Sequence, residues 1–497
     1  MELNAGLRYR IVIGLEVHVQ LQTSTKLFCS CTTRFGLASN TVTCPVCLGM
    51  PGVLPVMNRK AVELGVMTAL ALNCEISERT KWDRKNYYYP DLPKGYQVSQ
   101  YDLPLSQNGW LAIESPEPDR RIRIIRAHLE EDAGKSMHDE SGNGGESKVD
   151  LNRAGTPLLE IVSHPDLTSP EEARSYLEEL RLLLRTIEVS DCEMQEGSLR
   201  CDANVNIHIP LLDGGYTATP IVEIKNLNSF RSVERSVRYE AQRQYDQFLK
   251  DGKKIGEVSK ATAGWDDERG VTVVQRRKEE ASDYRYFPEP DLGLVVVNSL
   301  MLENAKSGMG ELPATTRKRL QAIYSLTQYD AKVITAQGRH FIGYFEELAT
   351  ISNDSKGASN WTTNAVLGWL KEKACGIQLF PIRPARLAGL ITQINKTGLN
   401  MQRAREVFGY MLDNGAAAED AAKFLDFVVF GDVILITELV RKAIAANPKA
   451  VADFNKGKAK AADAIKGFVM RETKGMARTE MVQEVVMSEI SAMPDTV

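Results

Sequence analysis

Residues Ile11 to Leu21 alternate with a period of two. Aliphatic side chains occupy every odd position, and the even positions from 14 to 20 are glycine or polar. This period is that of a β-strand, so the segment is expected to bury one face and to present Glu16 and His18 side by side on the other. Residues 202–208 and 221–225 repeat the pattern. Several strands with one polar face predict an open antiparallel sheet whose concave side holds a substrate.

A helix is expected between these strands, from Pro170 to Thr186. Ser169 suits the N-cap, Pro170 suits the first helical position, and Glu172 completes a capping box. After about residue 297 the apolar positions follow the helical period to the C-terminus. We therefore predict an α+β fold in three parts. These are an antiparallel-sheet cradle domain at residues 1–297, an all-α helical domain at 298–405 and a small helical tail domain at 406–497.

The composition argues against several classes of protein. The chain has 497 residues, of which 43% are hydrophobic, and its 61 lysines and arginines against 65 aspartates and glutamates give a net charge of −4. This balance argues against a polycation and against a largely disordered chain. No apolar run approaches the roughly 20 residues that cross a bilayer, and the first residues lack the layout of a signal peptide. We expect a cytoplasmic protein with no membrane partner.

Four of the eight cysteines lie within one short segment. Cys29 and Cys31 form one close pair, and Cys44 and Cys47 form a second pair after a short loop. Two such pairs are typical of a tetrahedral Zn²⁺ site, and four thiolates leave no open position, so the ion would brace the fold rather than catalyse. The alternative is four unconnected buried thiols. The other cysteines are interpreted as core residues; they are Cys74, Cys192, Cys201 and Cys375.

A second candidate metal site is rich in carboxylates. Glu16 and His18 share a strand face, residues 128–132 read His-Leu-Glu-Glu-Asp, and Glu160 ends a further motif. Hard oxygen ligands with one imidazole suit Mg²⁺ or Mn²⁺, and Mg²⁺ commonly accompanies nucleotide phosphates. The alternative is that each glutamate is a surface residue or half of an ion pair. No Walker A loop is present, because Leu129 occupies the position of its first glycine.

Two further stretches are able to contact nucleic acid. Residues 81–96 are dense in tyrosine, lysine and arginine, a composition that stacks bases and holds phosphates. Between Arg441 and Arg478 we count ten Lys/Arg against three Asp/Glu, a local charge of +7. Such a run binds a phosphate backbone in some proteins and is a solvated helical face in others. The tyrosines have a similar alternative, packing of a loop onto the sheet.

Several long and irregular motifs occur in the first part of the chain. They are Ile13–Val19, Pro51–Val56, Asp83–Tyr96, Glu130–Lys135, Asp150–Arg153, Gly197–Asn204, Glu223–Phe230 and Asp283–Asp291. Through these motifs the sequence resembles the B-subunit (GatB) family of aspartyl/glutamyl-tRNA(Asn/Gln) amidotransferases over nearly its whole length. The tail is similar to that family at residues 447–450 and 471–475.

The resemblance implies a defined activity. The protein would use ATP and Mg²⁺ to activate the side-chain carboxylate of misacylated Glu-tRNA(Gln) or Asp-tRNA(Asn) as an acyl phosphate. Ammonia released from glutamine by the A subunit, an amidase, would then give Gln-tRNA(Gln) or Asn-tRNA(Asn), in a complex that also contains a small C subunit. The resemblance also implies a set of Mg²⁺ ligands, with Glu130 held in reserve because one residue of register decides which glutamate faces the ion. The implied ligands are Glu16, His18, Glu131 and Glu160.

Basic residues supply the remaining roles in this hypothesis. We assign Arg200 and Lys225 to catalysis, and Lys85 and Arg153 to ATP phosphates, because phosphoryl transfer chiefly needs positioning and charge neutralisation. The tail would contact tRNA through the basic residues Lys456, Lys458 and Lys460. Two hypotheses from other classes remain open. One is a metal-dependent phosphohydrolase, and the other is a non-catalytic tRNA-binding scaffold.

Overall fold

The computed structural model divides the chain into two compact units, Met1–Pro313 and Ala314–Val497. It describes residues 9–118, 120–137, 147–277, 284–397, 399–425, 433–455, 461–473, 477 and 479–492. None of the helices in these described ranges is long and apolar enough to cross a membrane.

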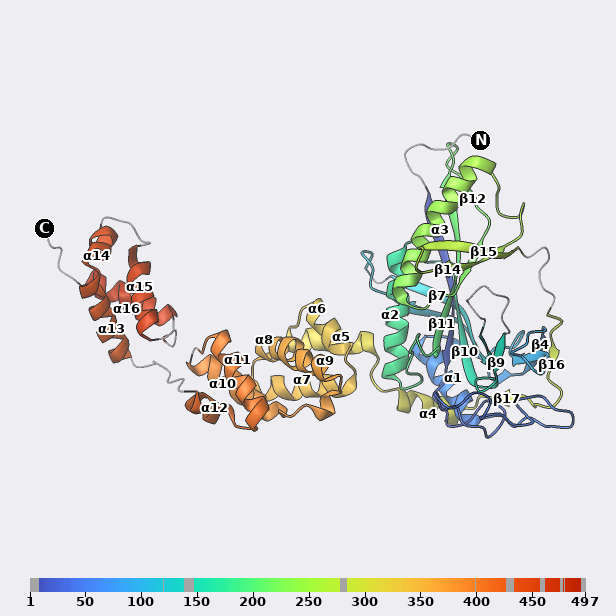
Figure 1. The fold of residues 1–497 in the computed structure, drawn as a ribbon, viewed down its shortest axis with the longest axis horizontal. Helices are drawn as coiled ribbons and strands as arrows, with labels where there is room; N and C mark the ends of the chain where they lie inside the picture. Colours follow the sequence, from blue (N-terminus) through green and yellow to red (C-terminus); the bar gives the residue numbers. More distant parts are fainter. Residues whose placement is uncertain are drawn as a thin grey trace. The chain divides into compact units, whose positions relative to one another are not determined.

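A ten-stranded sheet forms the centre of the first unit (Figure 1). The order is β15-β14-β13-β11-β1-β10-β7-β6-β2, and β12 pairs with β11 beside this path. Every pairing is antiparallel except β13 with β14, which is parallel, so the expected antiparallel sheet is present with one parallel pair. The strands are β1 (Arg10–Gln20), β2 (Glu75–Ile76), β6 (Ser106–Ala112), β7 (Arg121–Glu131), β10 (Pro157–Ser163), β11 (Leu199–Pro210), β12 (Tyr216–Ala218), β13 (Val222–Lys225), β14 (Ala261–Asp266) and β15 (Val271–Arg277).

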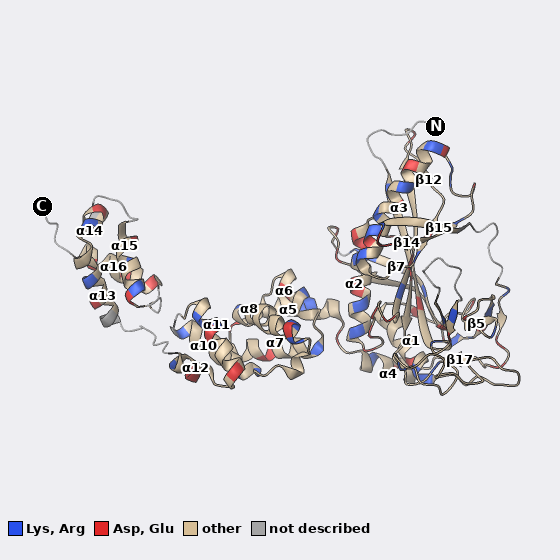
Figure 2. Cartoon of the chain, in the orientation of Figure 1, with Lys and Arg blue, Asp and Glu red and all other residues tan. Residues whose placement is uncertain are grey.

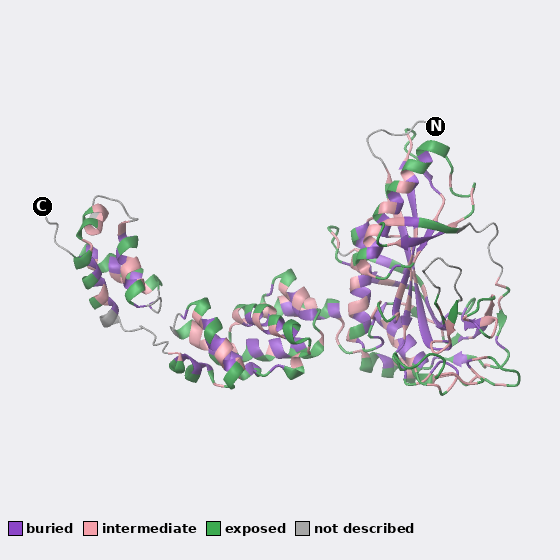
Figure 3. Ribbon diagram, viewed as in Figure 1, coloured by how far each residue is buried: buried purple, intermediate pink, exposed green. Residues whose placement is uncertain are grey.

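The alternation of β1 determines the two faces of this sheet. Ile13, Leu15 and Val17 are fully buried in the main apolar cluster of the unit, together with side chains from the helices. Figure 3 shows how continuously the central strands are buried. Helices α2 and α3 cover this apolar face (Figure 1), and α1 contacts β7. The helices of this unit are α1 (Arg59–Ala71), α2 (Pro170–Thr186), α3 (Phe230–Asp251) and α4 (Ser299–Met309).

Helix α2 has the bounds expected from the sequence. The Ser169 side chain accepts a hydrogen bond from the backbone N–H of Glu172 (3.1 Å), and Pro170 opens the helix. The carboxylate of Glu172 accepts in turn from the backbone N–H of Thr168 (2.8 Å). The second bond of the capping box therefore goes to the residue before the N-cap instead of to the N-cap itself. Both α2 and α3 carry many charged residues along their length (Figure 2).

The end of the first unit lies beyond the expected boundary at residue 297. Helix α4 packs on α1 and adds Ala305 to the main apolar cluster, so residues up to about 313 belong with the sheet. Three small sheets complete the described part of this unit. They are β16 (Phe287–Pro288) with β4 (Asp83–Asn86) and β5 (Tyr96–Ser99), β17 (Val295–Val296) with β3 (Arg79–Thr80), and β8 (Lys135–Met137) with β9 (Lys148–Asp150).

The second unit is helical throughout its described residues and contains two apolar clusters. One cluster spans Leu320 to Ala422 and the other spans Ile436 to Ile490, so the first extends past the expected boundary at 405. The helices are α5 (Pro313–Tyr324), α6 (Gln328–Thr335), α7 (Arg339–Ser352), α8 (Ser355–Asn360), the π-helix η1 (Trp361–Val366), α9 (Leu367–Lys373), the 3₁₀-helix η2 (Ile377–Leu379), α10 (Pro384–Thr397), α11 (Met401–Asn414), α12 (Ala418–Phe424), α13 (Val433–Ala446), α14 (Pro448–Asn455), α15 (Ala462–Glu472) and α16 (Thr479–Ser491). The predicted tRNA contacts Lys456, Lys458 and Lys460 lie outside the described residues.

Candidate active site and metal centre

A row of polar side chains crosses four neighbouring strands on the face of the sheet opposite the helices. Glu160 on β10 lies directly across from His18 on β1 and from His128 on β7. Arg200 on β11 lies directly across from His18 on its other side. Directly opposed residues of antiparallel strands share a face, so the row follows from the register of the sheet. Glu130, two residues after His128 on β7, extends it.

Three members of this row form a group that is able to hold a cation. The ligand atoms of His18, Glu130 and Glu160 all lie within 4.8 Å of one another. His18 Nε2 is 3.5 Å from Glu130 Oε1 and 3.7 Å from Glu160 Oε2. Two carboxylates and one imidazole suit Mg²⁺ or Mn²⁺ better than a soft metal. Both carboxylates are buried, a costly arrangement for anions unless a cation compensates them.

The protein itself supplies part of that compensation. Burial opposes the charge of Glu160, but His128, whose Nε2 is 3.3 Å from Glu160 Oε2, together with His18 and Lys85, holds the pKa of this carboxyl well below its usual range. Burial likewise opposes the charge of Lys85, but the carboxylates of Glu130 and Glu160 raise its pKa above the usual value. Lys85 comes from strand β4 of a small sheet, far from these residues in sequence. It therefore remains a cation beside the carboxylates.

Glu131 is not part of this group, although it was expected to be a ligand. Its carboxylate pairs with Lys94 and accepts a hydrogen bond from the backbone N–H of Val98 (2.8 Å). Successive residues of a strand point to opposite faces, so Glu130 and Glu131 cannot both face the row. The structure therefore brings the reserve residue Glu130, rather than Glu131, to His18 and Glu160.

A bulge explains this reversal. Ile122 and Ile124 are buried at even positions of β7, and continuing that phase would place Glu131 on the polar face. The register between β7 and β10 shifts where Ile125 is passed over, because Val162 pairs with residue 126 and Ser163 with residue 124. After the bulge the buried apolar positions are odd, and Glu130 faces the site.

Glu16 lies two residues before His18 on the same face of β1, but it is not a member of the group. Its carboxylate accepts a hydrogen bond from Asn204 Nδ2 on β11 (2.8 Å). Lys225 on β13 pairs with Asp202 (2.5 Å) and with Glu223 (2.7 Å). Both residues therefore lie on the polar face beside the row, with partners of their own.

Asp132 organises the remaining basic residues. Its Oδ2 atom is 2.8 Å from an Arg200 guanidinium nitrogen and 3.4 Å from Arg153 Nε, and it accepts a hydrogen bond from Gln20 (3.0 Å). Arg153 also donates to the backbone carbonyls of Ala133 and Gly134, at 3.0 and 2.6 Å. In this structure Arg153 shapes the turn after β7, whereas Arg200 extends the row itself. In the sequence Asp132 and His128 stood out only as parts of an acidic segment, because their pairing depends on the sheet register.

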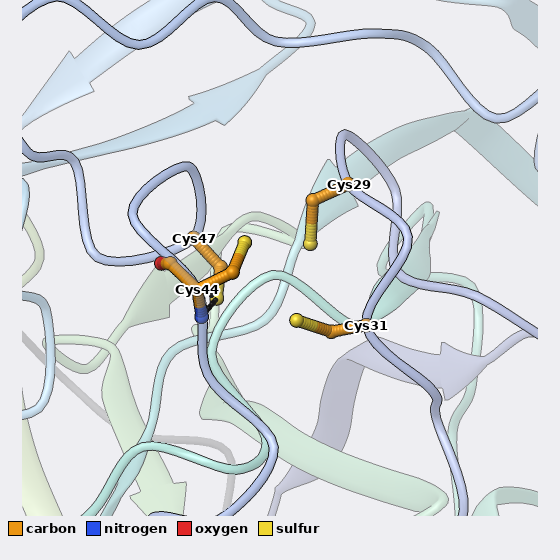
Figure 4. A group of neighbouring side chains, drawn as sticks. All are labelled: Cys29, Cys31, Cys44 and Cys47. Atoms are coloured by element: carbon orange, nitrogen blue, oxygen red, sulfur yellow. Dashed lines mark hydrogen bonds between the residues drawn. The ribbon is translucent and has the colours of Figure 1, made fainter.

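The four clustered cysteines converge as expected. The sulfur atoms of Cys29, Cys31, Cys44 and Cys47 all lie within 4.8 Å of one another (Figure 4). Cys44 and Cys47 come from one tight turn, in which the backbone N–H of Cys44 donates to Cys47 Sγ (3.2 Å). Four thiols at this spacing fit one tetrahedral ion such as Zn²⁺.

Local charge favours a thiolate at this group. A hydrogen bond from Cys29, with further contributions from the Cys44 backbone and from Lys26, lowers the pKa of Cys47 to about 4, against the effect of burial. The fully buried Lys26 places its Nζ 3.6 Å from Cys47 Sγ. A positive side chain that is held against one sulfur offsets part of the negative charge of a four-thiolate site.

The fold and the site define the class of this protein. It is an α+β protein with helical C-terminal parts, and its candidate catalytic groups are carboxylate, imidazole and lysine side chains on the polar face of a sheet. The chain belongs to the GatB family. Residues 11–303 match the GatB/GatE catalytic domain, and residues 343–490 match the GatB domain that follows it.

Curated relatives cover almost the whole chain. The B subunit of the aspartyl/glutamyl-tRNA(Asn/Gln) amidotransferase of Rhodopirellula baltica is 51% identical over 97% of both chains. The corresponding B subunit of Caldicellulosiruptor bescii is 46% identical over 97% of this chain and 99% of its own, and that of Thermotoga neapolitana is 44% identical over 97% and 98%. The family expected from the sequence is therefore confirmed.

Proposed function

We propose that this chain is the B subunit of a tRNA-dependent amidotransferase. It activates the side-chain carboxylate of misacylated Glu-tRNA(Gln), Asp-tRNA(Asn) or both by phosphoryl transfer from ATP. Ammonia from a partner glutaminase, the A subunit, then converts the acyl phosphate to the amide, in a complex that also contains a small C subunit. Near-complete coverage of relatives with this name supports the proposal.

The observation that carries the proposal is the convergence of His18, Glu130 and Glu160. These residues would hold Mg²⁺, which when bound neutralises nucleotide phosphates. Glu16 lies two residues before His18 on β1 and, in this proposal, contributes to Mg²⁺ binding. Glu131 supports the site from the opposite face of β7 through its ion pair with Lys94.

The basic residues around the row have separate tasks. Lys85 carries a positive charge beside the carboxylates and is placed to bind a phosphate oxygen. Arg200 presents a guanidinium held by Asp132, and Lys225 adds a third cation along the sheet. The acceptor carboxylate is already ionised at neutral pH, so its attack on phosphorus requires positioning and charge neutralisation rather than a strong base.

The cysteine cluster has a structural role in this proposal. It binds one Zn²⁺ that fixes the loop at residues 29–47, because four thiolates complete a tetrahedral shell and leave no position for a substrate. The thiols would release protons when Zn²⁺ binds, and the low pKa of Cys47 makes its thiol the easiest of them to deprotonate.

A phosphate-transfer assay on the reconstituted complex tests the proposal. We expect ATP-dependent transfer to the misacylated tRNA only when that tRNA and Mg²⁺ are both present, and we expect Glu160→Gln to abolish it. Hydrolysis of a small phosphate ester without tRNA would instead indicate a phosphohydrolase. Tight tRNA binding with no ATP consumption would indicate a scaffold, and either result would overturn the proposal.

A further inference from the structure

Five tyrosines form a continuous array in the first unit. The Tyr101 and Tyr286 rings stack in parallel, with centroids 4.1 Å apart. Tyr284 contacts Tyr286 edge-on at 6.1 Å, Tyr87 contacts Tyr284 at 6.0 Å, and Tyr89 contacts Tyr87 at 6.3 Å. We call these five residues the tyrosine array. They come from three separate chain segments, which the small sheet β16-β4-β5 brings together.

The backbone holds the array in place. Asn86 donates from its backbone N–H to the carbonyl of Tyr284 (2.9 Å) and from its side chain to the carbonyl of Arg285 (2.7 Å). Arg285 has a φ of 42°, a left-handed conformation that costs a non-glycine residue energy. The hydroxyl of Tyr87 bonds to Gln97 Oε1 (3.1 Å). The rings therefore form a fixed surface.

The two ends of the array are open to solvent. Tyr89 is 61% exposed and Tyr101 is 51% exposed, whereas the three rings between them are half-buried. An exposed, preorganised aromatic face is a surface on which a planar ligand can stack. Tyr89 contacts Tyr87 edge-on and Tyr101 uses one ring face to stack on Tyr286, so each of these exposed rings retains a face for such a ligand.

The middle of the array lies beside the candidate active site. Lys85 Nζ is 5.1 Å from the centroid of the Tyr284 ring, and the same ammonium is influenced by Glu130 and Glu160. Burial raises the pKa of Tyr286, and the negative charges of those two glutamates contribute. A ligand stacked on the array would therefore lie close to His18, Glu130 and Glu160.

We infer that the tyrosine array stacks unpaired nucleobases at the aminoacyl end of the tRNA. This inference rests on the proposed function, in which the reacting carboxylate is joined to the terminal nucleotide and must reach His18, Glu130 and Glu160. Unpaired bases stack on aromatic side chains regardless of sequence. One adenine of ATP needs a single ring, whereas an array with two exposed ends suits consecutive bases of a single strand.

The test uses the assembled complex and two RNA hairpins, one with an unpaired 3′ end and one blunt. Fluorescence anisotropy gives the dissociation constant for each. We expect Tyr101→Ala to weaken binding of the unpaired-end hairpin about tenfold, and Tyr89→Ala to act in the same direction. Tyr101→Phe keeps the ring and should bind as the unchanged protein does. The blunt hairpin should bind equally to all variants.

Tyr88→Ala is the matched control, because Tyr88 is 85% exposed and makes none of the ring contacts of the array. It should change the dissociation constant less than about twofold. An equal loss in Tyr88→Ala and Tyr101→Ala, or an unchanged constant in Tyr101→Ala, would overturn the inference. So would a higher KM for ATP with RNA binding unchanged, or a loss of complex assembly. Because binding is measured without phosphate transfer, failure of the proposed activity would leave this result interpretable.

Discussion

A single inserted residue decides which glutamate of β7 faces His18 and Glu160. The alternation of β1 was sufficient to place Glu16 and His18 on one face, because no irregularity interrupts that strand. In β7 the family resemblance implied Glu131, and the phase of Ile122 and Ile124 would favour the same residue only if no bulge intervened at Ile125. This bulge forms against β10, a strand distant from β7 in the sequence, so no local pattern within β7 predicts it.

This difference leads to a paired test of the two glutamates. Glu130→Gln should raise the Mg²⁺ concentration for half-maximal phosphate transfer at least about tenfold, because it removes an anionic ligand. Glu131→Gln should change that concentration less than about threefold, but should lower the melting temperature because Lys94 loses its buried partner. Mg²⁺ titrations and thermal melts of both variants measure these effects. A larger shift in Mg²⁺ dependence for Glu131→Gln would contradict the assignment.

Among the elements, those with local determinants were the ones that could be predicted. Helix α2 was predicted to its terminal residues, because its cap, its proline and its apolar stripe all lie within the segment. The cysteine cluster was predicted for the same reason. The parallel pair β13–β14 and the packing of α4 on α1 were not predicted, because each depends on a contact between distant segments.

The cap of α2 makes a direct stability prediction. Ser169→Ala removes the acceptor of the Glu172 N–H and should destabilise the first unit by about 1 kcal/mol. Ser169→Asp keeps an acceptor at the same position and should retain most of the stability. Denaturant melts of both variants measure the difference. Equal stability of Ser169→Ala and the unchanged protein would show that the cap is not limiting.

The cysteine cluster predicts a metal-dependent brace. Cys44→Ser should reduce bound zinc from about one ion per chain to a small fraction and lower the melting temperature by about 5–10 °C, because zinc binding is coupled to folding. Cys375→Ser, outside the cluster, should change neither. Metal analysis and thermal melts give both quantities. A chain that lacks zinc at full stability would contradict the proposed role.

At the level of the whole molecule, the two units correspond to different tasks in the proposed reaction. The first unit contains the row of polar side chains around His18, the cysteine cluster and the tyrosine array. The family matches divide the chain in a similar way, into residues 11–303 and 343–490. Activation of the carboxylate is therefore assigned to the first unit, and tRNA contacts distant from the reaction to the second.

This division predicts that the isolated chain does not release ammonia from glutamine. The sequence offered no nucleophile with a base and an orienting partner on a recognisable motif, and the proposed function assigns ammonia release to a partner protein. Ammonia release from glutamine should be at background for the chain alone and should appear when the partner is added. Release by the purified chain alone would contradict the division.

The basic tail provides the last prediction. Reversing the charges of Lys456, Lys458 and Lys460 should raise the KM for tRNA and make its salt dependence shallower. The reason is that tRNA binding with fewer phosphate contacts releases fewer counterions. The kcat at saturating tRNA and the KM for ATP should stay unchanged, since those depend on residues of the first unit.

The control reverses three exposed lysines elsewhere in the second unit, Lys371, Lys373 and Lys423, and changes the net charge equally. Equal effects of the two triple variants would indicate that net charge acts rather than a tail contact. A lower kcat with unchanged tRNA affinity would assign the tail a role in the reaction itself.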